Sequence, residues 1–200
     1  LERLLLLGDL DLGRLDLVER RVPLRLLVRD PDRAPDLPGA TPVVAPFADG
    51  DAVRAALAGV ETAFMVSASE AADRAQQHVT FVEAAAAAGV RHLVYLSFQG
   101  ASPASTFTFA RDHAVTEKAI RASGMAWTFL RDSFYADFMR GLVGDDGIIR
   151  GPGGDGRVAV VAQDDVELLW KLMEEQPGID LAMLKPFMPE ATQASGVFSG

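Results

Sequence analysis

Three polar side chains on one predicted helix have the types and spacing for proton transfer. His113 and Glu117 lie four positions apart among helix formers, which places an imidazole and a carboxylate on one helix face, and Lys118 follows directly. Because histidine titrates near neutral pH, His113 could act as a catalytic acid toward a substrate oxygen, with the Lys118 ammonium beside it. The alternative is an exposed ion pair between His113 and Glu117 that has no catalytic role.

A second group of candidates follows two apolar segments with the composition of β-strands. Residues 92–97 and 125–130 form these segments, and polar and aromatic residues follow each of them. Ligands bind beyond the carboxyl ends of strands in an open parallel sheet, so the site is expected there. Phe98, Phe134 and Tyr135 could stack on a planar ligand, or they could serve only as rim or core residues. The residues expected at these strand ends are 97–100 and 131–135.

The sequence LGDLDLG, after the first apolar run, contains glycines of the kind that phosphate-binding turns need. Glycine lets the backbone approach a pyrophosphate at a helix N-terminus, so we expect Gly8, Leu12 and Gly13 to contact a dinucleotide. Asp9 and Asp11 oppose this binding, because a carboxylate within about 4 Å of a phosphate costs roughly 1 to 4 kcal/mol. The dinucleotide is therefore expected to bind weakly. Alternatively, Gly8 and Gly13 only form a tight turn.

Strand-like and helix-forming segments alternate along the chain. Strands are expected at 4–7, 24–28, 62–66, 92–97 and 125–130, and helices over 51–58, 71–88 and 111–123, each helix followed by a glycine. The apolar positions of the last helix are Ala114, Val115, Ala119, Ile120 and Ala122. Further on, short strands are expected at 148–149 and 158–161 and a helix over 164–175. The alternation predicts an α/β fold with a doubly wound parallel sheet and right-handed crossovers.

Composition argues against several other classes of protein. The net charge of −9 leaves no basic face for nucleic acid, and the absence of cysteine excludes disulfides and thiolate chemistry. No apolar run approaches the roughly 20 residues of a membrane helix. The Gly-x-Ser-x-Gly motif of many esterases is absent, and His78 and His92 lack spaced partners for a metal. We expect a soluble cytoplasmic protein without nucleic-acid or membrane partners, either monomeric or homodimeric.

Four segments carry motifs of a known family. They are SFQGA at 97–101, ARDHAVTEKAI at 110–120, SGMAWTFLRDSFYADF at 123–138 and GDGRVAVVAQDDV at 154–166. These segments resemble the NmrA-like branch of the atypical short-chain dehydrogenases, with its bacterial NAD(P)H:quinone oxidoreductases the nearest subgroup. The resemblance implies a Rossmann-type NAD(P)-binding domain over 1–135 and a small, truncated substrate-binding lobe over 136–200. Because the chain starts at Leu1, we also expect that its amino end is incomplete.

The same resemblance implies a set of contacts to NADP(H). Arg29, at the end of the second strand, would bind the 2′-phosphate, although it could instead pair with Asp30 or Asp32 in solvent. The loop of Ser67 and Ser69 would lie beside the nicotinamide ribose, unless one of these serines only caps a helix. The complete set of expected contacts beyond the glycine turn is Arg29, Ser67, Ala68, Ser69, Ser133, Phe134, Tyr135 and Gln163.

The activity implied by the resemblance is hydride transfer from NADPH to a small quinone or enone. The chain departs from the family pattern TGATGxxG, because the middle glycine is missing. The usual Tyr-x-x-x-Lys base is also absent, since neither Tyr95 nor Tyr135 has a lysine four positions on. The alternative is a catalytically silent protein that senses the dinucleotide or serves as a scaffold.

Overall fold

The protein is built around one parallel β-sheet. The structure, a computed structural model, describes residues 2–6, 24–34, 36, 39–69, 71–135, 141, 143–148 and 160–162. The sheet strands within these residues are β1 (Glu2–Leu6), β2 (Leu24–Val28), β3 (Ala40–Val44), β4 (Val60–Met65), β5 (His92–Phe98) and β6 (Ala126–Asp132). Their order across the sheet is β3-β2-β1-β4-β5-β6, and every neighbouring pair is parallel. The predicted doubly wound Rossmann-type fold is confirmed.

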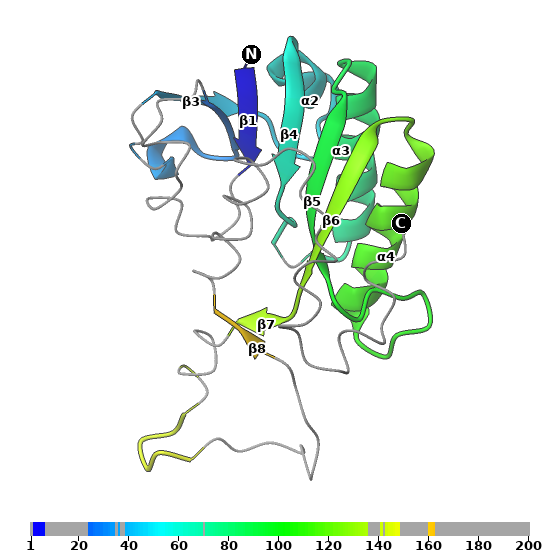
Figure 1. Cartoon of the computed structure of the whole chain (residues 1–200). Helices are drawn as coiled ribbons and strands as arrows, with labels where there is room; N and C mark the ends of the chain where they lie inside the picture. The colour runs from blue at the N-terminus through cyan, green and yellow to red at the C-terminus, as the bar shows by residue number, and fades with distance from the viewer. Residues whose placement is uncertain are drawn as a thin grey trace, which may run out of the picture.

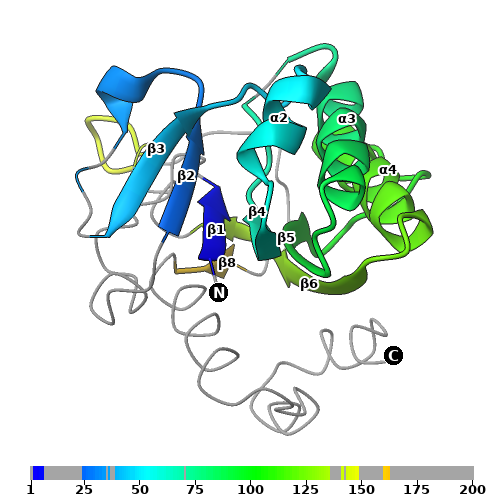
Figure 2. The same cartoon turned by 90° about the horizontal axis from the view of Figure 1, so that it is seen from above.

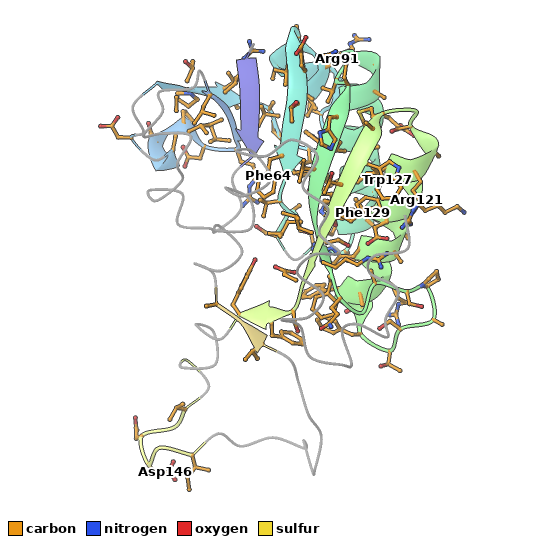
Figure 3. All side chains as sticks on the ribbon, in the orientation of Figure 1. Phe64, Arg91, Arg121, Trp127, Phe129 and Asp146 are labelled. Carbon is orange, nitrogen blue, oxygen red and sulfur yellow. The ribbon has the colours of Figure 1, made fainter. Side chains whose placement is uncertain are left out.

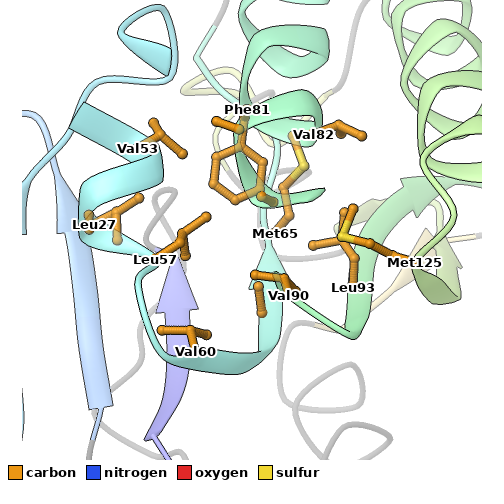
Figure 4. Close-up of a cluster of buried hydrophobic side chains, with 14 of the residues drawn as sticks. Leu27, Val53, Leu57, Val60, Met65, Phe81, Val82, Val90, Leu93 and Met125 are labelled. Atoms are coloured by element: carbon orange, nitrogen blue, oxygen red, sulfur yellow. The ribbon is translucent and has the colours of Figure 1, made fainter. Parts of the chain in front are cut away.

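Three helices cover one face of the sheet. Figure 2 shows α2 (Gly50–Ala56), α3 (Arg74–Ala87) and α4 (Thr108–Ala122) side by side on this face, and a short 3-10 helix, η2 (Pro31–Arg33), follows β2. Apolar side chains of these helices and of the sheet form a buried core (Figure 4). Its members include Leu27, Val53, Leu57, Met65, Phe81 and Leu93. Burial of this face holds α3 and α4 in register with the strands that they connect.

The order of the strands defines where a ligand can bind. After β3, at one edge of the sheet, the chain returns to the middle and forms β4 beside β1. The strands that follow β1 and the strands that follow β4 are therefore added in opposite directions across the sheet. Ligands of such sheets bind beyond the carboxyl ends of the strands at this switch point. A parallel pair of short strands, β7 (Phe134–Tyr135) and β8 (Val160–Val161), lies beyond the same edge (Figure 1).

The three helices predicted over 51–58, 71–88 and 111–123 are present, with shifted starts. Helix α3 begins at Arg74 and has Asp73 at its N-cap position, so the interpretation of Ser67 or Ser69 as its cap is wrong. Helix α4 begins at Thr108, earlier than expected. Both helices end near glycines with positive φ, 85° at Gly89 and 81° at Gly124, where a side chain would be strained.

Strand β3 was missing from the predicted elements, so the strand expected at 62–66 is the fourth in the chain and not the third. β3 forms an edge of the described sheet, and its side chains are mostly exposed or half-buried. It also contains Pro42, which cannot donate to a neighbouring strand and is tolerated at an edge. An edge strand of this kind has no apolar alternation from which a sequence could reveal it.

Few of the later predictions can be compared with the structure. Ile148 is described and is not in a strand, whereas Val160 and Val161 form β8. Residues 149 and 158–159, the helix expected over 164–175 and most of the predicted lobe lie outside the described residues. The division into 1–135 and 136–200 stays a prediction. In the described part of the chain, no helix has the length and apolar character needed to span a membrane.

Candidate functional site

The candidate site lies at the carboxyl ends of β2 and β4. Arg29 directly follows β2, and the loop 67–69 follows β4. The Arg29 Nη2 donates to Ser69 Oγ at 3.1 Å, so this contact spans the switch point between the two halves of the sheet. Both side chains are exposed. The structure therefore brings together two residues that the sequence assigned to cofactor binding.

The backbone of Ala68 is held from both sides by α3. Its N–H donates to His78 Nε2 at 2.9 Å, and its carbonyl accepts from Arg74 Nε at 2.8 Å. His78 and Arg74 are both buried, so these bonds are shielded from water. The loop carrying Ser67 and Ser69 is consequently fixed before any ligand arrives.

The contacts of His78 determine its tautomer. Because Nε2 accepts from Ala68, Nδ1 must carry the hydrogen and donate to Thr116 Oγ1 at 2.9 Å. The Thr116 hydroxyl then donates to the Asp112 carbonyl at 2.8 Å. Burial lowers the pKa of His78 to about 3, with further lowering by Arg74 and His113. His78 is therefore neutral at physiological pH.

A second chain of hydrogen bonds runs from α4 to the site loop. His113 Nδ1 lies 2.8 Å from Tyr95 Oη, which lies 3.3 Å from Ser67 Oγ. On the other side of the ring, Arg74 Nη2 is 3.5 Å from His113 Nε2, and Arg74 Nη1 forms an ion pair with Asp112 at 3.1 Å. His113 is thus connected to the candidate site through Tyr95 and does not reach it directly.

The expected charge state and exposure of His113 are wrong. His113 is 8% exposed, and burial, followed by the Arg74 charge, lowers its pKa to about 3. A neutral imidazole at pH 7 is not the ready proton donor that an ordinary histidine pKa suggested. The exposed ion pair with Glu117 is also wrong, because Glu117 is buried and has other partners.

Glu117 lies in a buried ionic cluster between α4 and the sheet. It accepts from the Ser97 hydroxyl at 2.7 Å and from Arg131 Nε and Nη2 at 2.8 and 2.6 Å. Arg121 contacts the same carboxylate at 3.2 Å and lies over the ring of Trp127 (Figure 3). Burial alone would raise the pKa of Glu117, but the hydrogen bonds from Arg131 and Ser97 outweigh it and the pKa is lowered. The cluster therefore links α4 to β5 and β6.

Lys118 does not join the site. It is exposed, whereas His113 and Glu117 are buried on the opposite side of α4. The ammonium is therefore on the solvent face, and we do not assign it to catalysis.

Aromatic rings gather where β5 and β6 end. Phe98, Phe107 and Phe134 contact one another, with ring centroids 5.5 to 5.6 Å apart, and Phe98 is 6.0 Å from the His113 ring. Phe134 is 37% exposed, so the cluster has an open side. It offers an apolar surface to a planar ligand.

The remaining predicted residues at this edge are polar. Ser133 and Tyr135 are half-buried. Burial raises the pKa of Asp132 to about 6, and a hydrogen bond from the Tyr135 hydroxyl only partly opposes the rise. Gly8, Leu12, Gly13 and Gln163 lie outside the described residues.

Comparison of the sequence with known protein families identifies the family to which this chain belongs. Residues 15–167 match a protein family described as NAD(P)H-binding. The chain belongs to the NAD(P)H-binding family. The family relationship inferred from the four motifs is thereby confirmed at this level.

Several proteins that are similar to this chain are reductases. Quinone oxidoreductase 2 of Escherichia coli is 35% identical over 144 residues, which cover 70% of this chain and 50% of that protein. The crystal structure of the E. coli NADPH-dependent quinone oxidoreductase with NADPH has a TM-score of 0.72 and 31% identity, covering 82% of this chain and 62% of that one. Citrobacter sp. triphenylmethane reductase with NADP(H) has a TM-score of 0.74 and 26% identity, covering 88% and 66%.

The matches cover only part of each related protein. This NAD(P)H-binding chain spans about half the length of the E. coli curated relative. A shorter match, 44% identical over 72 residues, is to the small subunit of 3-isopropylmalate dehydratase from Kocuria rhizophila and covers 36% of this chain and 30% of that protein. This shorter match covers too little of either chain to define a family.

Sequence reasoning missed the residues that fix the site loop of this NAD(P)H-binding chain. Tyr95 lies within an apolar strand, and Arg74 and His78 lie on the helix expected over 71–88, which was identified from its helix-forming residues and the glycine that follows it. Their partners are distant in sequence, so no local pattern marks them. The one available signal was the four-residue spacing of Arg74 and His78, which puts both on one helix face.

Proposed function

We propose that this chain binds NADPH at the carboxyl edge of β2 and β4 and is the cofactor-binding part of a reductase for small quinones. The observation that carries the proposal is the Arg29 to Ser69 contact across the switch point, at 3.1 Å. The relatives that bind NADPH or reduce quinones support it. The quinone-like substrate is the class that a flat apolar surface beside this edge would accept.

The residues at the end of β2 fit a phosphorylated ribose. Arg29 is exposed and cationic, which suits a 2′-phosphate. The neighbouring acid Asp30 is used elsewhere, since its carboxylate accepts from the Asp32 N–H at 3.0 Å and caps η2. In the described residues Arg29 pairs with neither Asp30 nor Asp32, so its charge is available to an anion.

The protein's own residues would supply position and surroundings. NADPH, when bound, supplies a hydride, and a protein of this class orients it. Arg74 and His78 hold the loop of Ser67 and Ser69 in one conformation. The ring of Phe134 presents an exposed apolar surface against which a quinone can stack.

A fluorescence titration of NADPH against the purified chain tests the proposal. We expect saturable binding of NADPH and weaker binding of NADH. We also expect reduction of a small quinone when it is added to the same sample. Absence of binding at millimolar chain concentration would contradict the proposal.

We expect the Arg29→Ala variant to lose the preference for NADPH over NADH. The preference should be about tenfold to a hundredfold in the unmodified chain, the value of a charge-assisted contact of roughly 1.5 to 3 kcal/mol. Arg54→Ala is the matched control, because Arg54 pairs with the exposed Asp51 on α2. Equal affinities for both cofactors in the unmodified chain would remove Arg29 from the site.

We also expect the combined change of Asp9→Ala and Asp11→Gly to strengthen NADPH binding. Two carboxylates leave the phosphate turn and one glycine returns, which removes a repulsion of roughly 1 to 4 kcal/mol per close carboxylate. Isothermal titration calorimetry measures the change, with Asp51→Ala as a control for net charge. Unchanged affinity would mean that these carboxylates do not face the phosphates.

A second candidate function is a silent dinucleotide sensor. The missing middle glycine and the absent Tyr-x-x-x-Lys motif favour it. This candidate predicts NADPH binding without turnover of any quinone. The titration and the turnover assay therefore separate the two functions.

A further inference from the structure

We infer that Ser67 is held as a hydrogen-bond donor to an oxygen of the ligand, with Tyr95, His113 and Arg74 as its positioning residues. This inference rests on the proposed function, because it takes the carboxyl edge of β4 as the ligand site. It assigns a direction to each hydrogen bond in the buried chain from α3 to the loop. The direction follows from the chemistry of each group in turn.

Arg74 sets the direction at the buried end of the chain. A guanidinium has donors and no acceptor, so His113 Nε2, 3.5 Å from Arg74 Nη2, must be an acceptor without hydrogen. Arg74 cannot turn away from this arrangement, because its other nitrogens bind the Ala68 carbonyl and the Asp112 carboxylate.

His113 passes the direction on to Tyr95. A neutral imidazole carries one hydrogen, and with Nε2 an acceptor this hydrogen is on Nδ1. The Nδ1–H therefore donates to Tyr95 Oη at 2.8 Å. Tyr95 is fully buried, so its hydroxyl depends on protein partners.

The Tyr95 hydroxyl in turn donates to Ser67. Its oxygen already accepts from His113, and its hydrogen is directed to Ser67 Oγ at 3.3 Å. Thr116 also contacts the Tyr95 hydroxyl, but it already accepts from His78 and donates to the Asp112 carbonyl, so in the arrangement that we infer the proton of Tyr95 goes to Ser67. Ser67 is consequently an acceptor toward the interior.

The hydrogen of Ser67 remains for the ligand. Within the described part of the chain, Tyr95 is the hydrogen-bond partner of Ser67, and in the arrangement inferred above Ser67 accepts from it and keeps its own hydrogen. The residue is half-buried at the end of β4. A donor fixed in this way suits a carbonyl or hydroxyl oxygen, and it stabilises negative charge that develops there. The oxygen can belong to the cofactor or to the quinone.

Nitrogen NMR of the histidine rings tests the direction without any ligand. The chain has three histidines, so His113→Gln assigns the His113 signals by their loss. We expect neutral His113 at pH 7 with hydrogen on Nδ1 and none on Nε2. Hydrogen on Nε2, or a doubly protonated ring, would overturn the inference whether or not NADPH binds.

Ser67→Ala and Tyr95→Phe test the effect on the ligand. We expect each to weaken NADPH binding or to lower kcat/KM for the quinone about three- to tenfold, the range of one hydrogen bond. A loss of NADPH affinity assigns the acceptor oxygen to the cofactor, and a loss of kcat/KM at constant affinity assigns it to the quinone.

The control is Thr128→Val, which removes a hydroxyl bonded to His92 at 2.9 Å, within β6 and away from the carboxyl edge. If Ser67→Ala matches this control in both assays, Ser67 is not a ligand donor. If the unmodified chain binds no NADPH, the proposed function fails, and the NMR measurement still decides the direction of the chain.

Discussion

The Glu117→Gln variant is expected to lose about 3 kcal/mol of its free energy of unfolding, near the lower end of the range for breaking a buried ion pair. Glu117 is 2% exposed and receives two hydrogen bonds from Arg131. The amide keeps the shape and still accepts from Ser97, but it leaves the Arg131 charge without its counterion. The Arg131 side chain is 22% exposed, which lets water reduce the loss somewhat.

Urea denaturation at pH 7 measures this loss, with the slope of the transition compared between variants. Asp51→Asn is the matched control, because it breaks an exposed ion pair with Arg54 and should cost about 0.5 kcal/mol or less. Adding Arg131→Met to Glu117→Gln removes the unpaired charge and should recover part of the loss. A Glu117→Gln loss as small as that of the control would show that the cluster contributes little.

The sheet was predictable because its central strands are buried on both faces. Residues 24–28 are apolar except for Arg25, and residues 93–96 are an unbroken apolar run inside β5, while Gly89 and Gly124 follow the helices α3 and α4. The predicted positions of Arg29 and of the loop after β4 at one edge also follow from parallel strands alone. Strand β3 could not be recognised in this way, because an exposed edge strand has no such run.

The interior of the site was not predictable from local patterns. The buried face of α4 includes His113, Thr116 and Glu117, whereas the apolar Val115 is 45% exposed. These buried polar groups have partners on other elements. His113 contacts Tyr95 of β5, and Glu117 accepts from Arg131 of β6. Such partners become visible only when the elements are packed, and they also change the pKa of the histidines from the ordinary value on which the sequence argument relied.

Acidification from pH 7 to pH 5 is expected to destabilise the fold through His78 and His113. Both have pKa values lowered from 6.5 to about 3, chiefly by burial. The unfolded chain then binds more protons than the native chain below pH 6.5, so their contribution is complete above that pH and is lost as the pH falls. Together they should remove about 4 kcal/mol between pH 7 and pH 5. Asp132, whose pKa is raised to about 6, opposes this change by about 1 kcal/mol.

Urea denaturation at pH 7, 6 and 5 measures the loss, and His113→Gln should reduce its dependence on pH by about one proton. The amide of glutamine can still accept from Arg74 and donate to Tyr95, so the variant removes the titration with little change in packing. A direct check on the native chain is the ring-proton NMR shift of each histidine, which should stay constant from pH 8 to pH 5 for His78 and His113. A free energy of unfolding that is constant or rises on acidification would mean that these rings are protonated in the native state. The neutral chain from Arg74 to Ser67 could not then exist, because a doubly protonated His113 would present Nε2–H to a guanidinium that has only donors.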